Sequence, residues 1–256
     1  MQAQVDLNAD MGEGFGPWTM GDDAALLDVV TSANIACGFH AGDPDVMAQA
    51  MALAVARGVG LGAHPGFGDL QGFGRRRIEM SHHSIGNLVR YQLGAAEALA
   101  RAAGGRLRHL KLHGALANMA AEDAGMARAC YDAALSVDPG ITLMVLAGTA
   151  QEIAARELGA SIACEIFADR AYEEDGRLVD RRKPGAVIHD AGLAAQRILA
   201  MLEAGGIISE SGRVLPTRID TICLHGDTAD AVALARDLRA ALEASGVRLA
   251  PFEGRR

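Results

Sequence analysis

The sequence contains little lysine, few aromatic residues and no long hydrophobic run. Only two of its 256 residues are lysine, Lys111 and Lys183, aromatic residues make up 4%, and the net charge is −8. The absence of a basic stripe with interleaved aromatic residues argues against nucleic-acid binding. No apolar stretch reaches the roughly 18 residues of a membrane span, and the first residues show neither the basic nor the apolar region of a signal peptide. These absences predict a cytoplasmic protein that binds neither nucleic acid nor membrane.

Two common kinds of site are also missing. The four cysteines, Cys37, Cys130, Cys164 and Cys223, are far apart and show no zinc-finger spacing. Three of them fall in apolar strand-like stretches, which favours buried free thiols over disulfides. The glycine-rich segment 10–18 is not a nucleotide-binding P-loop, because no Gly-Lys-Ser/Thr follows its glycines. The sequence therefore contains no recognisable ATP-binding loop.

Strand-like and helix-like segments alternate along the chain. Strands are predicted near residues 3–8, 31–38, 59–64, 107–113, 141–147, 161–168 and 219–225. Helices are predicted over about 44–57, 81–103, 121–136, 150–158, 189–204 and 228–245. Asp43 and Ser81 are the predicted N-caps of the first two helices. Alternation of this kind is typical of a parallel sheet with helices packed on it.

The polarity of the strands favours a closed barrel over an open sheet. Strands of an open sheet, covered on both faces, are nearly continuous apolar runs. Here His109, Lys111 and His113 share one face of their strand, while Leu110 and Leu112 share the other. Seven β/α units at this length match a slightly reduced version of the eight-unit barrel. We therefore predict an α/β fold in which residues 1–256 form a single seven-unit (β/α) barrel domain.

Ionisable side chains stand at or near the C-terminal ends of several predicted strands. These residues are Asp10, His40, His64, His113, Asp169 and His225. In (β/α) barrels this end of the strands carries the active site. The pattern therefore predicts a polar barrel mouth that suits a small anionic molecule.

The chemistry of these groups suggests acid–base catalysis. Asp10 or Glu13 can act as a general base that activates water, although Glu13 can equally cap backbone N–H groups of its turn. Lys111 is placed to stabilise negative charge on an oxygen or to hold a phosphoryl group. The alternative for Lys111 is a buried ion pair with Asp6 or Glu165. His113 can transfer protons or bind an acyl oxygen.

A metal site is a further alternative at the same rim. Asp10, His40 and His64 would form a set of two histidines and one carboxylate. However, the sequence contains no His-x-x-x-His or His-Glu-x-x-His helix. The sequence therefore does not require a metal.

Two loops supply arginines, which bind carboxylates through two parallel hydrogen bonds. The loop 64–77 contains Arg75, and the segment 169–184 begins with Arg170 near Tyr172. Residues 174–177 of that segment, Glu-Asp-Gly-Arg, are typical of a hairpin turn. We therefore predict a lid insertion over 169–184. The alternative is a solvated face whose arginines offset the neighbouring acidic residues.

Longer motifs run in order across nearly the whole chain. They are residues 6–16 (DLNADMGEGFG), 32–43 (SANIACGFHAGD), 62–66 (GAHPG), 72–76 (GFGRR), 111–116 (KLHGAL), 165–172 (EIFADRAY), 178–181 (LVDR) and 223–227 (CLHGD). As a set they resemble the LamB/YcsF lactam-utilisation family, whose members form the A component of bacterial 5-oxoprolinase. The resemblance implies a barrel similar to the glycoside hydrolase/deacetylase fold.

The resemblance also implies an activity, a cofactor and partners. The reaction would be ATP-dependent opening of 5-oxoproline (pyroglutamate) to glutamate, in a complex with 5-oxoprolinase subunits B and C. ATP would be a cofactor of the complex. In that reaction Asp10 or Glu13 would activate water, Lys111 and His113 would stabilise the oxyanion or phosphate, and His40 and His64 would position the ring. Alanine-rich helix faces leave room for a homo-oligomer.

The remaining predicted contacts concern the substrate. Arg75 or Arg170 would hold its carboxylate, and Asn8, Tyr172 and His225 complete the substrate-binding set. Two rival functions stay open from the sequence. One is a stand-alone metal-dependent amidase or deacetylase, and the other is a non-catalytic subunit that presents substrate to its partners.

Overall fold

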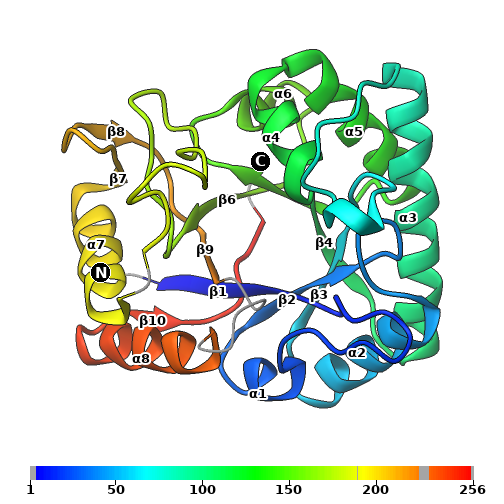
Figure 1. The fold of residues 1–256 in the computed structure, drawn as a ribbon, viewed down its shortest axis with the longest axis horizontal. Helices are drawn as coiled ribbons and strands as arrows, with labels where there is room; N and C mark the ends of the chain where they lie inside the picture. Colours follow the sequence, from blue (N-terminus) through cyan, green and yellow to red (C-terminus); the bar gives the residue numbers. More distant parts are fainter. Residues whose placement is uncertain (1–3, 189, 225–230, 255–256) are drawn as a thin grey trace.

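The computed structural model describes residues 4–188, 190–224 and 231–254, and its centre is a closed barrel of parallel strands (Figure 1). The barrel strands are β1 (Gln4–Met11), β2 (Ser32–Ala36), β3 (Gly60–His64), β4 (Leu107–Lys111), β5 (Thr142–Leu146), β6 (Ile162–Phe167) and β9 (Thr221–Leu224). Each strand pairs in parallel with the next, and β9 pairs with both β6 and β1. This double pairing closes the ring and confirms the predicted (β/α) barrel.

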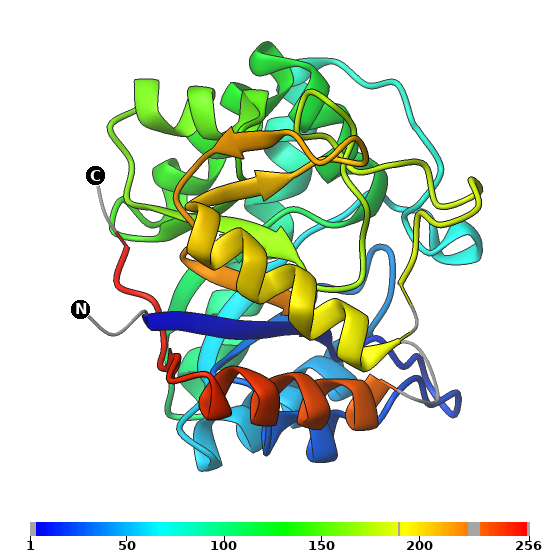
Figure 2. The ribbon, with the colours of Figure 1, turned by 90° about the vertical axis from the view of Figure 1, so that its left-hand side faces the viewer.

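Helices surround the barrel on its outside (Figures 1 and 2). They are α1 (Asp23–Leu27), α2 (Pro44–Ala56), α3 (His82–Ala102), α4 (Gly114–Glu122), α5 (Ala124–Val137), α6 (Ala150–Glu157), α7 (Ala191–Ala204) and α8 (Ala231–Ala244). Strand residues such as Leu7, Ile35 and Leu110 are fully buried in the core beneath these helices. Burial of each such side chain is worth about 1.5–3 kcal/mol.

Side-chain caps fix most helix starts where the sequence predicts them. Asp43 accepts hydrogen bonds from the backbone N–H groups of Asp45 and Val46, and Ser81 caps α3. The predicted helix over 121–136 is wrong at its start. Asp123 has an extended backbone (φ −129°), so it ends α4 and its side chain caps α5. The helix over Gly114–Glu122 was not predicted.

Several smaller elements extend beyond the seven repeating units. The short strands β7 (Gly206–Ile208) and β8 (Val214–Pro216) form an antiparallel hairpin after α7, and β10 (Arg248–Leu249) pairs with the start of β1. The 3-10 turn η1 (Leu70–Gly72) lies in the loop after β3. Within the described part of the chain, no helix combines the length and apolar character that crossing a membrane requires.

Polar side chains fill the barrel interior in layers that rise from the bottom towards the mouth. The inward face of β1 contributes Asp6, Asn8 and Asp10 at successive levels, as the alternation predicts. In the middle layer the Asn8 side chain accepts a hydrogen bond from Asn34 (2.7 Å), and His109 Nε2 donates to Asn34 Oδ1 (2.7 Å). His109 therefore has the structural role that its depth in the strand suggests.

A glycine makes room for this middle layer. A Cβ added to Gly62 on β3 would lie 2.0 Å from His109 Nε2. Any side chain at position 62 would therefore displace the His109 ring and break its hydrogen bond to Asn34.

The lowest layer contains a buried acid with a perturbed pKa. Asp6 is fully buried and accepts hydrogen bonds from Thr31 (2.5 Å), Ser32 (2.7 Å) and Thr221 (2.5 Å). Burial raises the pKa of Asp6 from 3.8 to about 6, and these three hydroxyl groups only partly offset the effect. At neutral pH this carboxyl is ionised, and its ionisation costs more free energy in the folded protein than in the unfolded chain.

We expect this acid to make stability depend on pH. Because its pKa is higher in the folded protein, the stability it contributes is present below about pH 4 and is lost as pH rises through about 6. Relative to Asp6→Asn, the wild-type free energy of unfolding should fall by about 2.5 kcal/mol between pH 4 and 7.5. Urea unfolding of both proteins across this range measures the difference, with the exposed Asp28→Asn as control. A difference that does not change with pH would contradict the prediction.

Candidate active site

A large cavity opens at the C-terminal ends of the barrel strands. Its volume is about 1080 Å³, slightly above the range usual for small-molecule sites. Its deep wall contains the predicted residues Asp10, Glu13, His64, Lys111 and His113. The structure therefore brings together side chains from β1, β3 and β4 that are far apart in sequence.

Lys111 lies at the centre of this wall and is nearly fully buried. Its Nζ lies 2.9 Å from Asp10 Oδ1 and 2.9 Å from Glu165 Oε1. It also donates a hydrogen bond to Cys223 Sγ at 3.0 Å and lies over the ring of Phe167. The expected ion pair with Glu165 is confirmed, whereas the expected alternative with Asp6 is wrong, because Asp6 lies at the opposite end of the barrel and Asp10 takes its place.

These partners keep Lys111 charged. Burial alone would lower its pKa, but the carboxylates of Asp10 and Glu165 reverse the effect and raise the pKa well above its ordinary value. Burial raises the pKa of Cys223 well above its ordinary value too, so this residue is a neutral thiol. The cavity therefore has a permanent ammonium ion at its base.

Asp10 is held in one orientation by its neighbours. Oδ1 accepts hydrogen bonds from Lys111 and from Asn34 Nδ2, both at 2.9 Å. Oδ2 lies 3.3 Å from His64 Nε2. Asp10 is the penultimate residue of β1, not part of the following turn as the sequence suggested, because β1 extends to Met11. A strand position gives this carboxylate a more fixed place than a loop would.

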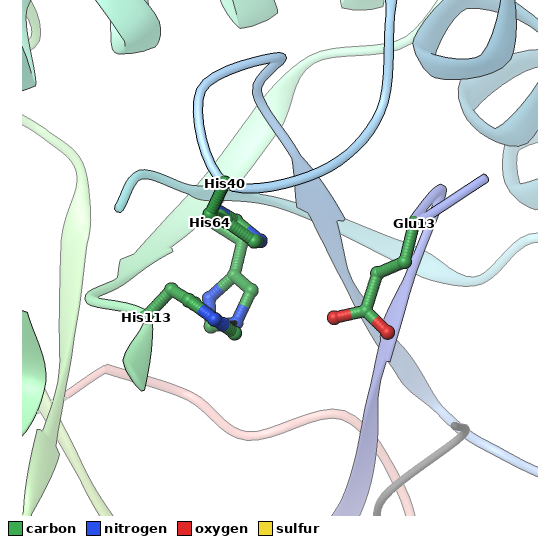
Figure 3. Close-up of side chains that lie close together, drawn as sticks. All are labelled: Glu13, His40, His64 and His113. Atoms are coloured by element: carbon green, nitrogen blue, oxygen red, sulfur yellow. Dashed lines mark hydrogen bonds between the residues drawn. The ribbon is translucent and has the colours of Figure 1, made fainter. Parts of the chain in front are cut away.

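Three histidine rings, those of His40, His64 and His113, lie together near the mouth of the barrel (Figure 3). His64 Nδ1 donates to the carbonyl oxygen of Lys111 at 2.9 Å, and His113 Nε2 donates to that of Phe73 at 2.8 Å. The other two nitrogens, His64 Nε2 and His113 Nδ1, are 3.0 Å apart. The His40 ring stacks on the His113 ring, with centroids 3.6 Å apart and planes within 6°.

Burial keeps two of these rings neutral. It lowers the pKa of His113 to about 3 and the pKa of His40 well below its ordinary value, and the neighbouring histidines add to both effects. His40 does not line the cavity, and neither of its ring nitrogens has a hydrogen-bond partner among the described residues. Contact between His40 and a substrate would therefore need a rearrangement of the rings.

Glu13 extends from the segment after β1 towards the histidine rings (Figure 3). One donor atom each from Glu13, His40, His64 and His113 lies within 4.8 Å of the others. The metal set considered from the sequence was Asp10, His40 and His64. In the structure Asp10 contacts mainly Lys111. The possible metal-binding group instead consists of Glu13, His40, His64 and His113.

The insertion at 169–184 forms much of the outer wall of the cavity. Its predicted turn is present, since Glu173 and Arg177 are joined by a backbone hydrogen bond of 2.8 Å. A small core of Ala171, Val179 and Ala186 holds it together. The position of the insertion over the cavity agrees with the predicted lid, whose movement stays a prediction.

Two residues of this region have structural roles that the sequence did not indicate. Arg170 is buried and donates to the carbonyl oxygens of Val179 and Ala186, although it also borders the cavity. Burial lowers its pKa to about 10, so it stays charged. Tyr172 lies outside the cavity lining, and its hydroxyl accepts a hydrogen bond from the backbone of Phe167. The geometry therefore favours Arg75, which is exposed and lines the cavity, for contact with an anion.

The remaining predictions have different outcomes. Asn8 lies beneath the cavity and not in its lining, where its side chain donates to Thr221. His225 lies outside the described residues. Glu165 and Cys223 contact Lys111 but were not predicted as site residues. A signal for Cys223 was present, because it falls on the inward face of its strand.

Comparison with known proteins gives a consistent result. The sequence pattern of the LamB/YcsF family matches residues 5–256. The 5-oxoprolinase A subunit of Ruegeria pomeroyi is 66% identical over 250 residues, which cover 98% of this chain and 99% of that protein. The corresponding 5-oxoprolinase A subunit of Rhodopseudomonas palustris is 53% identical over 252 residues, which cover 98% and 99%.

Solved structures agree with the fold. The crystal structure of a lactam utilization protein from Thermus thermophilus superimposes with a TM-score of 0.91 at 44% identity, covering 97% of this chain and all of the other. A GH113 β-1,4-mannanase superimposes with a TM-score of 0.52 at 10% identity, covering 95% and 99%. At that identity the second likeness concerns the barrel alone.

Proposed function

Since this chain belongs to the LamB/YcsF family, we propose that it is the A subunit of an ATP-dependent 5-oxoprolinase. The complex would hydrolyse 5-oxo-L-proline to L-glutamate, with 5-oxoprolinase subunits B and C as partners. The names of the similar proteins support a role in the 5-oxoprolinase system. The observation that carries the proposal for the site is the charged Lys111 between Asp10 and Glu165 at the base of an open cavity.

The chemistry of the substrate explains the need for ATP. A five-membered lactam is a resonance-stabilised amide and therefore a poor electrophile at neutral pH. Phosphorylation of its carbonyl oxygen would activate the ring carbon for attack by water. Cleavage of the C–N bond would then leave an acyl phosphate of glutamate, from which a second water would release the phosphate. Because the sequence has no P-loop, we assign the delivery of ATP to the partner subunits.

The residues around the cavity suit the later steps. Lys111 would stabilise negative charge on the carbonyl or phosphate oxygen, since a buried ammonium acts strongly where water is excluded. Asp10, oriented by Lys111 and Asn34, would accept the proton of the attacking water. Asp10 would then return this proton to the ring nitrogen as the C–N bond breaks.

The outer part of the cavity suits anion binding. Arg75 would hold the substrate carboxylate, because its guanidinium group is exposed to the cavity and charged at every relevant pH. The volume of about 1080 Å³ exceeds the needs of one small lactam. We assign the surplus to the phosphoryl group or to a segment of a partner subunit.

Reconstitution tests the proposal. The purified chain is mixed with its partner subunits, ATP and 5-oxoproline, and glutamate release is measured with each component omitted in turn. We expect release only from the complete mixture. Release without this chain would contradict the proposal, and ATP-independent release by this chain alone would favour the stand-alone amidase.

A further inference from the structure

The hydrogen bonds of His64 and His113 determine where their protons lie. Carbonyl oxygens only accept, so His64 Nδ1 and His113 Nε2 must each carry a hydrogen. A neutral imidazole has one N–H group and one lone pair. When both rings are neutral, lone pairs therefore remain on His64 Nε2 and His113 Nδ1. These atoms are 3.0 Å apart, a distance at which two lone pairs repel unless a positive ion interacts with both.

This arrangement matches the surroundings of a metal site. A histidine that binds a metal almost always donates its other N–H group to a carboxylate or a backbone carbonyl, which fixes the ring and its tautomer. Both rings make this bond here. Their planes are at 88° to each other, so both lone pairs can point towards one centre. Glu13 provides a carboxylate oxygen within 4.8 Å of the histidine donor atoms.

We propose that Glu13, His64 and His113 bind one divalent transition-metal ion of the Zn²⁺ type at the wall of the cavity. All three line the cavity, so an ion can enter and a coordination position can remain open on that side. Two imidazoles and one carboxylate favour Zn²⁺, Mn²⁺ or Fe²⁺ over Ca²⁺ and Mg²⁺, which prefer oxygen ligands.

His40 is excluded from the ligand set by its geometry, although its nitrogens lie within the same distance. A metal ion lies in the plane of each imidazole that binds it. The His40 and His113 rings are parallel and stacked, so their planes share no point where one ion could sit. His40 also lies behind the cavity wall. It supports the His113 ring and is a positioning residue in this proposal.

Metal binding can be tested on the chain alone, without substrate or partners. After treatment with a chelator, the protein is titrated with Zn²⁺ and Mn²⁺ by calorimetry. We expect one ion per chain, and no competition from equimolar Mg²⁺ or Ca²⁺. Glu13→Gln and His113→Asn should each weaken Zn²⁺ binding by at least about 100-fold, whereas His40→Asn should weaken it by no more than about 10-fold. The exposed His83→Asn is the matched control and should bind like wild type.

A crystal soaked in Zn²⁺ gives a second readout that does not depend on the stability of a variant. We expect an anomalous peak between Glu13, His64 and His113. A peak elsewhere, no binding by the wild-type chain at millimolar Zn²⁺, or unchanged affinity in both Glu13→Gln and His113→Asn would overturn the proposal. If no metal ion binds, only a proton would lie between His64 Nε2 and His113 Nδ1.

Discussion

Replacing Lys111 with methionine is expected to lower glutamate release by the assembled complex by about 100- to 1,000-fold. Methionine has a similar length but removes the charge that Asp10 and Glu165 hold at 2.9 Å. Loss of one partner of a buried ion pair also destabilises a protein, by about 3–5 kcal/mol. Lower activity of this variant alone would therefore not distinguish the loss of a catalytic group from the loss of folded protein.

A charge-balanced variant separates the two effects. Lys111→Met combined with Glu165→Gln removes one positive and one negative charge, so the net charge of the cluster is unchanged. We expect urea unfolding to show recovered stability and the assay to show no recovered activity. Glu165→Gln alone controls for the loss of that carboxylate. A folded double variant with wild-type turnover would remove Lys111 from the mechanism.

Asp10→Asn should reduce kcat by about 100- to 10,000-fold, because it removes the proposed general base. The change is nearly isosteric, and Asn can still accept a hydrogen bond from Lys111 or Asn34. The steady-state assay of the complex measures kcat and KM separately. Asp28→Asn, at an exposed carboxylate paired with Arg57, is the control.

The division of the effect between kcat and KM distinguishes two functions of the chain. A catalytic Asp10 predicts a loss in kcat with a nearly unchanged KM. A role limited to presenting substrate predicts the reverse, a higher KM with kcat retained. The second pattern would show that the ring-opening chemistry takes place on a partner.

The barrel and its inward-facing residues follow from the sequence because side-chain alternation is a local rule. On β1 the rule places Asp6, Asn8 and Asp10 inside the barrel, and on β4 it does the same for His109 and Lys111. Closure of the ring then brings the strand ends together. The meeting of Asp10, His64 and Lys111 is therefore a consequence of topology.

The pairing of groups within the site depends on distances that alternation does not specify. Lys111 pairs with Glu165 and Asp10 and not with Asp6, because the height of each residue depends on strand register and tilt. The same limit applies to Glu13, which follows β1. The sequence predicted the end of this strand near residue 8, whereas β1 ends at Met11. The position of Glu13 beside His113 emerges only from the folded turn.

The insertion was the least predictable part because it has no periodic pattern. Arg170 was one of two arginines expected to bind the substrate carboxylate, the other being Arg75. In the structure the chain folds back, and Arg170 donates to the carbonyl oxygens of Val179 and Ala186. Tyr172 turns towards the backbone of Phe167 for a similar reason. The positions of backbone carbonyl and N–H groups leave no trace in the sequence, so roles of this kind could not be predicted.

The place where the lactam binds tests the central proposal most directly. We predict that a crystal structure of the assembled complex with 5-oxoproline shows the lactam carbonyl within hydrogen-bond distance of Lys111 Nζ, with the substrate carboxylate towards Arg75. Density for 5-oxoproline only on a partner protein, with the cavity of this chain filled by water, would contradict the proposed reaction site.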